Sequence, residues 1–402
     1  MATGTGRILG WVAAGWAAVF LAGTSFRVLA DCSAFGLPFT DLGSTTFCAQ
    51  IAEAYYSGLT NGTSATAYSP SANVNREQMA AFVTRTLDQS LLRGNRRSAL
   101  DQWWTQTPRY DAYGSPGLTT VGLSPEFLKS DGTDIWVANP SNDSVSRVRA
   151  SDGKKLEDWT GATWAYGVLV AMGRVFVTGY LPPPGRLYMI DPSGTAGPVT
   201  TVASNLGDNP YSIAFDGSRL WTANYSGSVS IVTPGATLPW SVTPKPLAST
   251  ALQGIVFDGA NMWVTDANGG TLLELDSDAN IVKTVTVGSF PSFPAFDGHN
   301  IWVPNRNSNS VTVVRTIDGT VLKTFSTANG NANGLSKPTQ AAFDGQRILV
   351  TNYDGGLSLF KATDLSVIGN LPTTGVDNPF GVCSDGINFW VSFIGSGNIG
   401  RF

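Results

Sequence analysis

Residues 282–314, VKTVTVGSFPSFPAFDGHNIWVPNRNSNSVTVV, contain the pattern that decides the fold. An alternating strand at 282–287 leads through a turn to a short apolar strand and then to the pair Asp297-Gly298. A second strand centred on Trp302, a turn rich in Asn and Ser, and a third strand at 311–314 follow. Asp-Gly between two strands predicts a tight hairpin, because glycine accepts a positive φ. The stretch therefore predicts short antiparallel strands joined by tight turns.

The same phrase occurs seven times, at intervals of 39 to 47 residues. The copies begin at Asp131, Met172, Asp216, Asp258, Asp297, Asp344 and Asp385. One large side chain stands at the centre of each second strand, namely Trp136, Phe176, Trp221, Trp263, Trp302, Leu349 and Trp390. Units of this length with four short strands are typical of propeller blades, and their large side chains would fill the wedges between blades. The sequence predicts a mainly β fold, a seven-bladed β-propeller.

The two ends of the repeat region predict how the ring closes. The seventh copy stops at Phe402, after its third strand. A fourth-strand phrase, LTTVGLSP at 118–125, precedes the first copy and aligns with TVTVGSFP at 284–291. We expect residues 117–121 to complete the seventh blade and cover its open edge. The propeller is thus expected to span residues 117–402.

These repeats resemble the YVTN, NHL and streptogramin-lyase propellers, most closely over residues 282–314. The resemblance implies a binding face where the fourth-to-first and second-to-third connections meet. Streptogramin lyases use His and Glu near that centre, whereas the single histidine here, His299, falls in the hairpin between a first and a second strand. A binding protein without enzymatic activity is therefore favoured. An enzyme of the lyase type, acting through Glu126 or Asp266, is the alternative.

Two sets of positions are expected to line the binding face. The first lies four and five residues before each Asp-Gly, and its candidate ligand contacts are Glu126, Tyr211, Gln253, Phe293, Gln340 and Phe380. In the second copy the same count gives Gly167 and Val168. The second set ends the second strands, with Asn139, Asn224, Asn305, Asn352 and the acidic Asp266. Aromatic rings beside amides suit a neutral polar ligand such as a glycan or a peptide. Alternatively, the recurring asparagines hold local turns through their side chains, which their recurrence favours.

The N-terminus has the pattern of an export signal. Arg7 precedes an uncharged stretch at 8–26, and Val28-Leu29-Ala30 provides small residues for cleavage. We expect residues 1–30 to be removed, with a retained membrane anchor as the alternative. Export would place Cys32 and Cys48 in an oxidising compartment, where they could form a local disulfide. Cys383 falls in a strand pattern and is expected to be a buried free thiol.

Residues 39–88 are helical in pattern and differ from the repeats. Phe47, Ile51 and Tyr55 recur at four-residue spacing, and Asn75 with Gln78 suits a helix capping pair. The segment resembles an S-layer homology (SLH) module in Phe39-Thr-Asp41, Gly58-Leu-Thr-Asn-Gly62, Tyr68-Ser-Pro70 and Val74-Asn-Arg-Glu-Gln-Met-Ala80. The resemblance implies that Arg76, by its position in the motif, contacts an acidic cell-wall polysaccharide. Alternatively, Arg76 only occupies a solvated helix start.

The composition excludes further classes of partner and site. The net charge of −4 argues against nucleic acid as a partner, since phosphate binding needs clustered positive charge. One histidine and three cysteines exclude a rich zinc site, and no metal or cofactor is expected. We assign 31–88 to a small α-helical SLH-like module and 89–116 to a linker.

Together these patterns predict a bacterial protein that is secreted to the cell envelope or cell surface, with no membrane span after signal removal. The SLH-like module would attach it to cell-wall polysaccharide, and the propeller would bind an envelope protein or a glycan. A propeller enzyme and a structural surface-layer component are the alternatives.

Overall fold

The computed structural model describes residues 37–42, 51, 54–55, 60, 62–75, 78–83, 118–249, 251–327, 334–373 and 378–402. The chain divides into two units, residues 1–89 and 90–402. The expected signal, the Cys32–Cys48 pair, Arg76 and the linker lie outside the described residues. Within the part that is described, no helix is long and apolar enough to span a bilayer.

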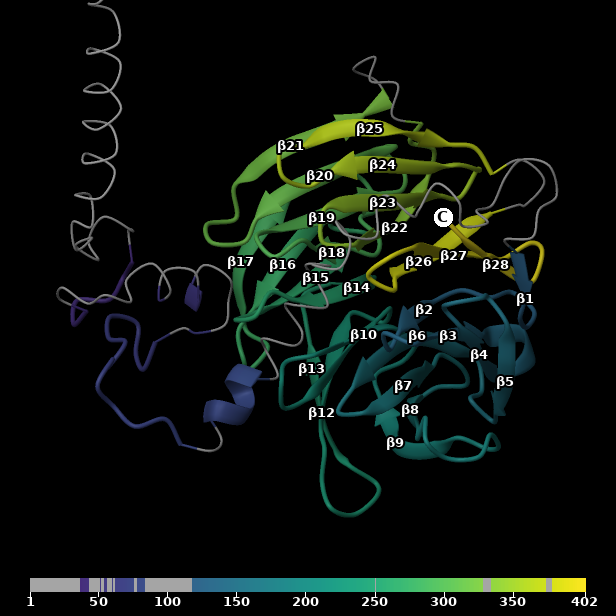
Figure 1. Cartoon of the computed structure of the whole chain (residues 1–402), viewed down its shortest axis with the longest axis horizontal. Coiled ribbons are helices and arrows are strands. Elements are labelled where there is room, and N and C mark those ends of the chain that lie inside the picture. Colours follow the sequence, from purple (N-terminus) through teal and green to yellow (C-terminus); the bar gives the residue numbers. More distant parts are fainter. Residues whose placement is uncertain are drawn as a thin grey trace, which may run out of the picture. The chain divides into compact units, whose positions relative to one another are not determined.

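The larger unit consists of seven four-stranded antiparallel sheets (Figure 1). Blades 1 to 4 contain β2 (Leu128–Ser130), β3 (Asp134–Asn139), β4 (Ser144–Arg149) and β5 (Lys155–Thr160); β6 (Ala165–Ala171), β7 (Arg174–Gly179), β8 (Gly185–Ile190) and β9 (Thr200–Leu206); β10 (Pro210–Phe215), β11 (Leu220–Asn224), β12 (Ser228–Thr233) and β13 (Ser241–Pro246); and β14 (Leu252–Phe257), β15 (Met262–Asp266), β16 (Thr271–Leu275) and β17 (Ile281–Thr286). Blades 5 to 7 contain β18 (Ala295–Phe296), β19 (Asn300–Asn305), β20 (Ser310–Arg315) and β21 (Val321–Ser326); β22 (Pro338–Phe343), β23 (Arg347–Asn352), β24 (Leu357–Lys361) and β25 (Ser366–Leu371); and β26 (Pro379–Ser384), β27 (Phe389–Phe393), β28 (Asn398–Arg401) and β1 (Leu118–Thr120).

The innermost strands form an unbroken circle. Each first strand contacts the first strand of the next blade, in the order β2, β6, β10, β14, β18, β22 and β26, and β26 returns to β2. The seven-bladed propeller predicted from the repeats is confirmed.

The strand expected to close the ring is β1, which pairs with β28 in blade 7. Leu118, Thr119 and Thr120 lie opposite Gly400, Ile399 and Asn398, in antiparallel register. The Thr119 hydroxyl also donates to the carbonyl oxygen of Gly153 in blade 1, at 2.6 Å. The segment therefore completes blade 7 and also bonds blade 7 to blade 1.

The repeated Asp-Gly phrase builds both the hairpin and the core of the blade. In five blades one Asp oxygen accepts a hydrogen bond from the indole N–H five residues later, at 2.7–2.8 Å. The other oxygen accepts backbone N–H groups of the turn, and the following glycine has a φ of 86° to 101°. The seven large residues predicted at the centre of the second strands are all buried.

Two blades depart from this scheme. Blade 6 has Leu349 in place of Trp, and its Asp344 bonds instead to the guanidinium of Arg347 at 2.9 Å. Blade 2 has Phe176 and no Asp; Ala171, which pairs with Arg174, occupies the Asp position, five residues before Phe176. The hairpin has the same length as in the other blades, but Met172 occupies the position of the glycine in Asp-Gly, so a count from Met172 is displaced by one residue.

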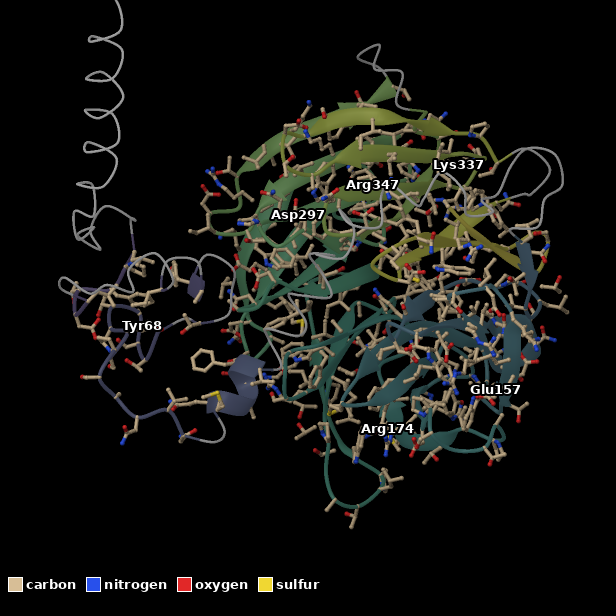
Figure 2. The ribbon with its side chains drawn as sticks, viewed as in Figure 1. Tyr68, Glu157, Arg174, Asp297, Lys337 and Arg347 are labelled. Carbon is tan, nitrogen blue, oxygen red and sulfur yellow. The ribbon has the colours of Figure 1, made fainter. Side chains whose placement is uncertain are left out.

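In the N-terminal unit the carboxylate of Asp41 joins two parts of the sequence. It accepts the backbone N–H of Tyr68 at 2.8 Å and that of Ser69 at 2.7 Å, and these bonds lower the pKa of Asp41. Phe39 packs against the rings of Tyr55 and Tyr68; Tyr68 is labelled in Figure 2. Asn75 and Gln78 exchange side-chain-to-backbone bonds of 2.8 and 3.0 Å, so the capping pair is confirmed.

Candidate functional site

In each blade, one residue of the first strand pairs with the central large residue of the second strand. This pair gives a common reference point from which equivalent positions in the blades can be counted. In blades 1 to 3 the paired residues are Lys129 with Trp136, Leu169 with Phe176, and Ala214 with Trp221. Three residues earlier stand Glu126, Tyr166 and Tyr211, which therefore occupy equivalent positions. Counting five residues back from Met172 gives Gly167 instead, because Met172 occupies the glycine position of the turn, one residue after the Asp position. Tyr166 was missed for this reason.

Three phenylalanine rings converge at this level of the ring. Phe127 lies 4.6 Å from Phe293 and 5.5 Å from Phe380, between ring centroids, and Phe293 lies 6.0 Å from Phe380. They come from blades 1, 5 and 7, and at most 8% of each residue is exposed. Phe293 and Phe380, predicted to contact a ligand, are thus buried in a central aromatic plug.

Beside the plug, four tyrosines and one glutamate form what we call the tyrosine–glutamate cluster: Glu126, Tyr166, Tyr180, Tyr211 and Tyr225. Tyr166 lies 5.0 Å from Tyr180 and 4.9 Å from Tyr211, and Tyr211 lies 5.0 Å from Tyr180 and 5.3 Å from Tyr225. All five residues are half-buried. Tyr180 and Tyr225 directly follow β7 and β11, one position after the predicted second set.

Glu126 is the unusual ionisable group of this cluster. Its carboxyl bonds to the Tyr166 hydroxyl, while Oε2 is buried and has no partner. Loss of solvent raises the pKa of Glu126 to about 7. Burial also raises the pKa values of Tyr166 and Tyr211 above 10, so both phenols stay neutral at physiological pH. Glu126 can accept or release a proton near neutral pH, which is the property that general acid–base catalysis requires.

Hydroxyl groups bond neighbouring blades together at this level. The Ser392 hydroxyl of blade 7 donates to the backbone oxygen of Glu126 at 2.5 Å. Thr265 and Thr351 make the same bond to Ser292 and Phe380 of the following blades, at 2.7 and 2.6 Å. These bonds fix the backbone that carries Glu126.

The four asparagines predicted to face a ligand are fully buried at the ends of the second strands. The amide N–H groups of all four donate to serine or threonine hydroxyls on the adjacent third strand. The amide oxygens of Asn139, Asn305 and Asn352 accept backbone N–H groups of the incoming connection at 3.0–3.1 Å. These contacts support the alternative in which the asparagines hold the turns, and a ligand role for Asn139, Asn224, Asn305 and Asn352 stays a prediction.

The remaining candidates are also held in place by the fold. Gln253 and Gln340 are buried, and the Gln340 side-chain oxygen accepts the backbone N–H of Val382 at 2.9 Å. Asp266 is buried and accepts the backbone N–H of Gly269 at 3.1 Å. His299 is exposed in the Asp-Gly hairpin, at the other end of the first strand from the position equivalent to Glu126. Glu126 is therefore the candidate whose surroundings best suit proton transfer.

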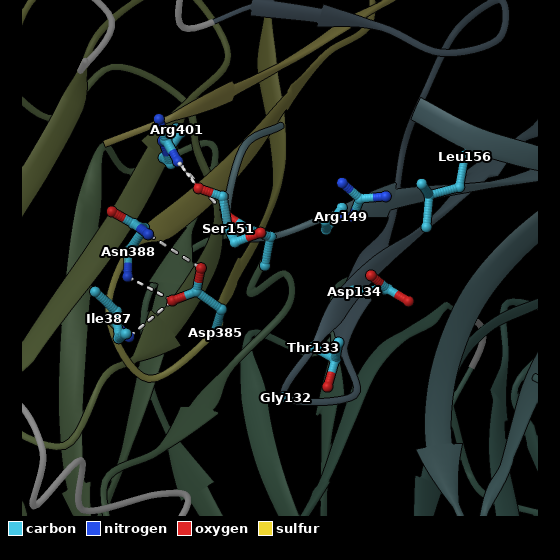
Figure 3. Close-up of a pocket in the computed structure, with 11 residues that line it drawn as sticks. Gly132, Thr133, Asp134, Arg149, Ser151, Leu156, Asp385, Ile387, Asn388 and Arg401 are labelled. Atoms are coloured by element: carbon cyan, nitrogen blue, oxygen red, sulfur yellow. Dashed lines mark hydrogen bonds between the residues drawn. The ribbon is translucent and has the colours of Figure 1, made fainter. Parts of the chain in front are cut away.

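A separate cavity lies at the hairpin end of the boundary between blades 7 and 1 (Figure 3). Its volume is about 540 Å³, and Arg149, Arg401, Asp134 and Asp385 are among its lining residues. Arg401 donates to the backbone oxygen of Ser151 at 3.2 Å, and Asp385 accepts the N–H groups of its own turn and of Trp390. Because these charged groups have partners within the fold, the cavity presents no unpaired charge from them.

The geometry of the N-terminal unit and its sequence agree with a known family. Residues 38–80 match the family described as S-layer homology domain. The chain carries an SLH domain. The Asp41 contacts and the Asn75–Gln78 cap lie within the matched residues. The match covers residues 38–80 of the N-terminal unit and leaves the propeller outside it.

The propeller is similar to several solved structures at low sequence identity. A streptogramin B lyase structure has a TM-score of 0.57 and 14% identity, covering 71% of this chain and 96% of that chain. An inactive virginiamycin B lyase from Staphylococcus aureus with quinupristin has a TM-score of 0.57 and 15% identity, covering 71% and 98%. Kuenenia stuttgartiensis hydrazine synthase has a TM-score of 0.57 and 16% identity, covering 73% and 98%. No curated protein matches the chain. At these identities the likeness shows the fold alone.

The raised pKa of Glu126 predicts a dependence of stability on pH. The folded protein holds this proton more tightly than the unfolded chain does, so the free energy of unfolding falls as pH rises from 4.5 to about 7. We expect Glu126→Gln to remove this component and to be more stable than the parent by about 3 kcal/mol above about pH 8. Urea denaturation of both proteins across this range measures the difference. A constant difference at every pH would contradict it.

Proposed function

We propose that this protein is exported to the bacterial envelope, where its SLH domain binds cell-wall polysaccharide and its propeller binds an envelope protein or glycan. The SLH domain itself indicates association with the cell surface. Its presence on the same chain as a propeller is the observation that carries the proposal. A single chain of this kind brings whatever the propeller binds to the wall.

The position of Arg76 supports a role in wall binding. The side chain of Asn75 caps the backbone N–H of Gln78. From its sequence position directly after Asn75, we expect Arg76 to fall in the first turn of the helix. A positive charge there opposes the helix dipole and does not help the helix to form. The residue is better explained by an anionic ligand, such as the acidic polysaccharide that the family resemblance implies.

The tyrosine–glutamate cluster supports a binding role for the propeller. Its five side chains leave part of their surface exposed at one level of blades 1 to 3. Aromatic rings with polar ends supply large contact areas together with hydrogen-bonding groups. A purely structural surface-layer component would not need this cluster, whereas a binding protein would use it to contact a ligand.

Wall attachment can be measured by sedimentation of the full chain with purified cell walls. We expect Arg76→Ala to weaken retention by about tenfold, because a charge-assisted contact is lost. The matched control is Arg174→Ala, which removes the same charge from the start of β7, where Arg174 pairs with Asp191 at 3.1 Å (Figure 2). This control should sediment like the parent. Equal retention of the Arg76 variant, or equal losses in both variants, would contradict the proposed role.

A further inference from the structure

The carboxyl group of Glu126 lacks a cationic partner within the fold. The ion pairs of the described propeller residues do not include it, and its Oε2 atom is buried without a hydrogen-bond partner. Tyr166 supplies its one side-chain contact. A buried carboxyl in such surroundings either keeps its proton or takes a cation from outside. Oε2 is therefore an unsatisfied acceptor that a positively charged hydrogen-bond donor would match.

Tyr166 and Tyr211 lie near Glu126, and Tyr180 and Tyr225 pack against them, so the cluster brings electron-rich rings close to the carboxyl. A cation gains energy over the face of a tyrosine ring, and more so when solvent is excluded. None of the cation–ring contacts in the described part of the chain falls on these four rings. The negative carboxyl and the ring faces thus favour the same kind of ligand, and they oppose an anionic one.

The propeller already contains a contact of this kind at an equivalent position. Arg306 and Tyr353 each follow a second strand directly, as Tyr180 and Tyr225 do. The Arg306 guanidinium lies 4.7 Å from the centroid of the Tyr353 ring. On blades 5 and 6 the chain supplies its own cation to a tyrosine, whereas on blades 2 and 3 the corresponding tyrosines are left without one.

The depth of the vacant oxygen limits the shape of the ligand. Oε2 is buried, and the neighbouring Tyr166 and Tyr211 are half-buried, so the group that reaches it must be slender. An ammonium on a flexible alkyl stem meets this requirement, because its methylenes can lie along the rings while its head reaches the carboxylate. An amino group attached directly to a sugar ring cannot reach this oxygen unless the broad ring enters with it.

We propose that the tyrosine–glutamate cluster binds the lysine side chain of a partner protein, with Glu126 as its counter-ion and the tyrosine rings around its alkyl stem. This rests on the proposed binding function of the propeller and names its ligand class. The ammonium donates to Oε2, and no covalent step is involved. The neutral phenols of Tyr166 and Tyr211 face Glu126 and hold no competing charge.

The test is calorimetric titration of the full chain with Nα-acetyl-lysine amide and with Nα-acetyl-norleucine amide, which lacks the ammonium. We expect Nα-acetyl-lysine amide (below, lysine amide) to bind at millimolar concentration and at least about tenfold more tightly than Nα-acetyl-norleucine amide. Glu126→Gln should abolish that preference. The control Glu157→Gln removes a carboxylate that pairs with Arg147 in blade 1, and it should bind like the parent. Lysine binding should also weaken below about pH 7, where a proton occupies Glu126.

Three results would overturn the proposal: equal affinity for the two amides, no binding of lysine amide at millimolar concentration, or unchanged lysine binding by Glu126→Gln. Tighter binding of glucosamine than of lysine amide would also overturn the lysine assignment in favour of a glycan. Wall sedimentation of the same preparations depends on Arg76. A negative lysine titration would therefore not contradict wall attachment, and a negative sedimentation result would not contradict lysine binding.

Discussion

Removing residues 117–121 is expected to lower the free energy of unfolding by about 5 kcal/mol or more and the melting temperature by roughly 15 °C. The deletion takes away β1, three residue pairs with β28, and the buried side chain of Val121. It also removes the bonds from Thr119 to Gly153 and from Lys155 to the backbone oxygen of Val121, which join β1 to blade 1. Blade 7 would be left with an exposed edge at β28. Calorimetry of the parent and the truncated protein measures the loss.

A rescue variant separates ring closure from general damage. The deleted segment can be attached after Phe402 through a glycine-containing turn, so that it follows β28 as a fourth strand follows a third in the other blades. We expect this variant to recover most of the lost stability. An unchanged melting curve for the truncated protein would refute the closure, and no recovery on re-attachment would refute the pairing as its cause.

Gly381→Ala is expected to destabilise the boundary between blades 7 and 1 by about 4 kcal/mol and to lower the melting temperature by about 10 °C. A Cβ atom at Gly381 would lie 2.0 Å from the backbone oxygen of Glu126 and 2.9 Å from the Ser392 hydroxyl. That oxygen is held by the 2.5 Å bond from Ser392, so the strain cannot be relieved by a side-chain rotation. The two blades must move apart, and the carboxyl of Glu126 must move with its backbone.

The control for this variant is Gly369→Ala in β25. A Cβ atom there meets nothing within 4 Å, and the backbone of Gly369 is not in the left-handed region. The control should melt within a few degrees of the parent, because alanine restricts the unfolded chain without a steric cost. The lysine titration adds a second measurement, since Gly381→Ala should also weaken binding at Glu126. Similar melting curves for the two alanine variants would contradict this account of blade packing.

The fold was predictable because every blade repeats the same local sequence pattern. The Asp-Gly turn, the central large residue and the displaced phrase at 118–125 are local signals that recur, and the paired strands confirm them. The free, buried state of Cys383 followed from its strand pattern in the same way.

The site was predicted only in part, because its geometry depends on register. Glu126 and Tyr211 were found by counting from Asp-Gly, but in blade 2 the count began at Met172, one residue after the Asp position, and so missed Tyr166. Aligning the copies on Phe176 and the tryptophans would have identified it. Tyr180 and Tyr225 were missed because the last residue of the second strand points into the blade, where the asparagines make their bonds. The convergence of Phe127, Phe293 and Phe380 depends on distances across the ring, which no local pattern contains.

The strand that seals the propeller is also the point at which the N-terminal part of the chain enters it. If the SLH domain binds the wall and the propeller binds a ligand, as proposed, tension between them would pass through the backbone into Leu118. Among the described residues, the first contacts to bear that tension would be the pairs of β1 with Gly400, Ile399 and Asn398. Within the described part of the chain, these three residue pairs and the bonds of Thr119 and Val121 to blade 1 would bear the load, so we expect stretching of the anchored protein to open the ring at its seam before any other blade unravels.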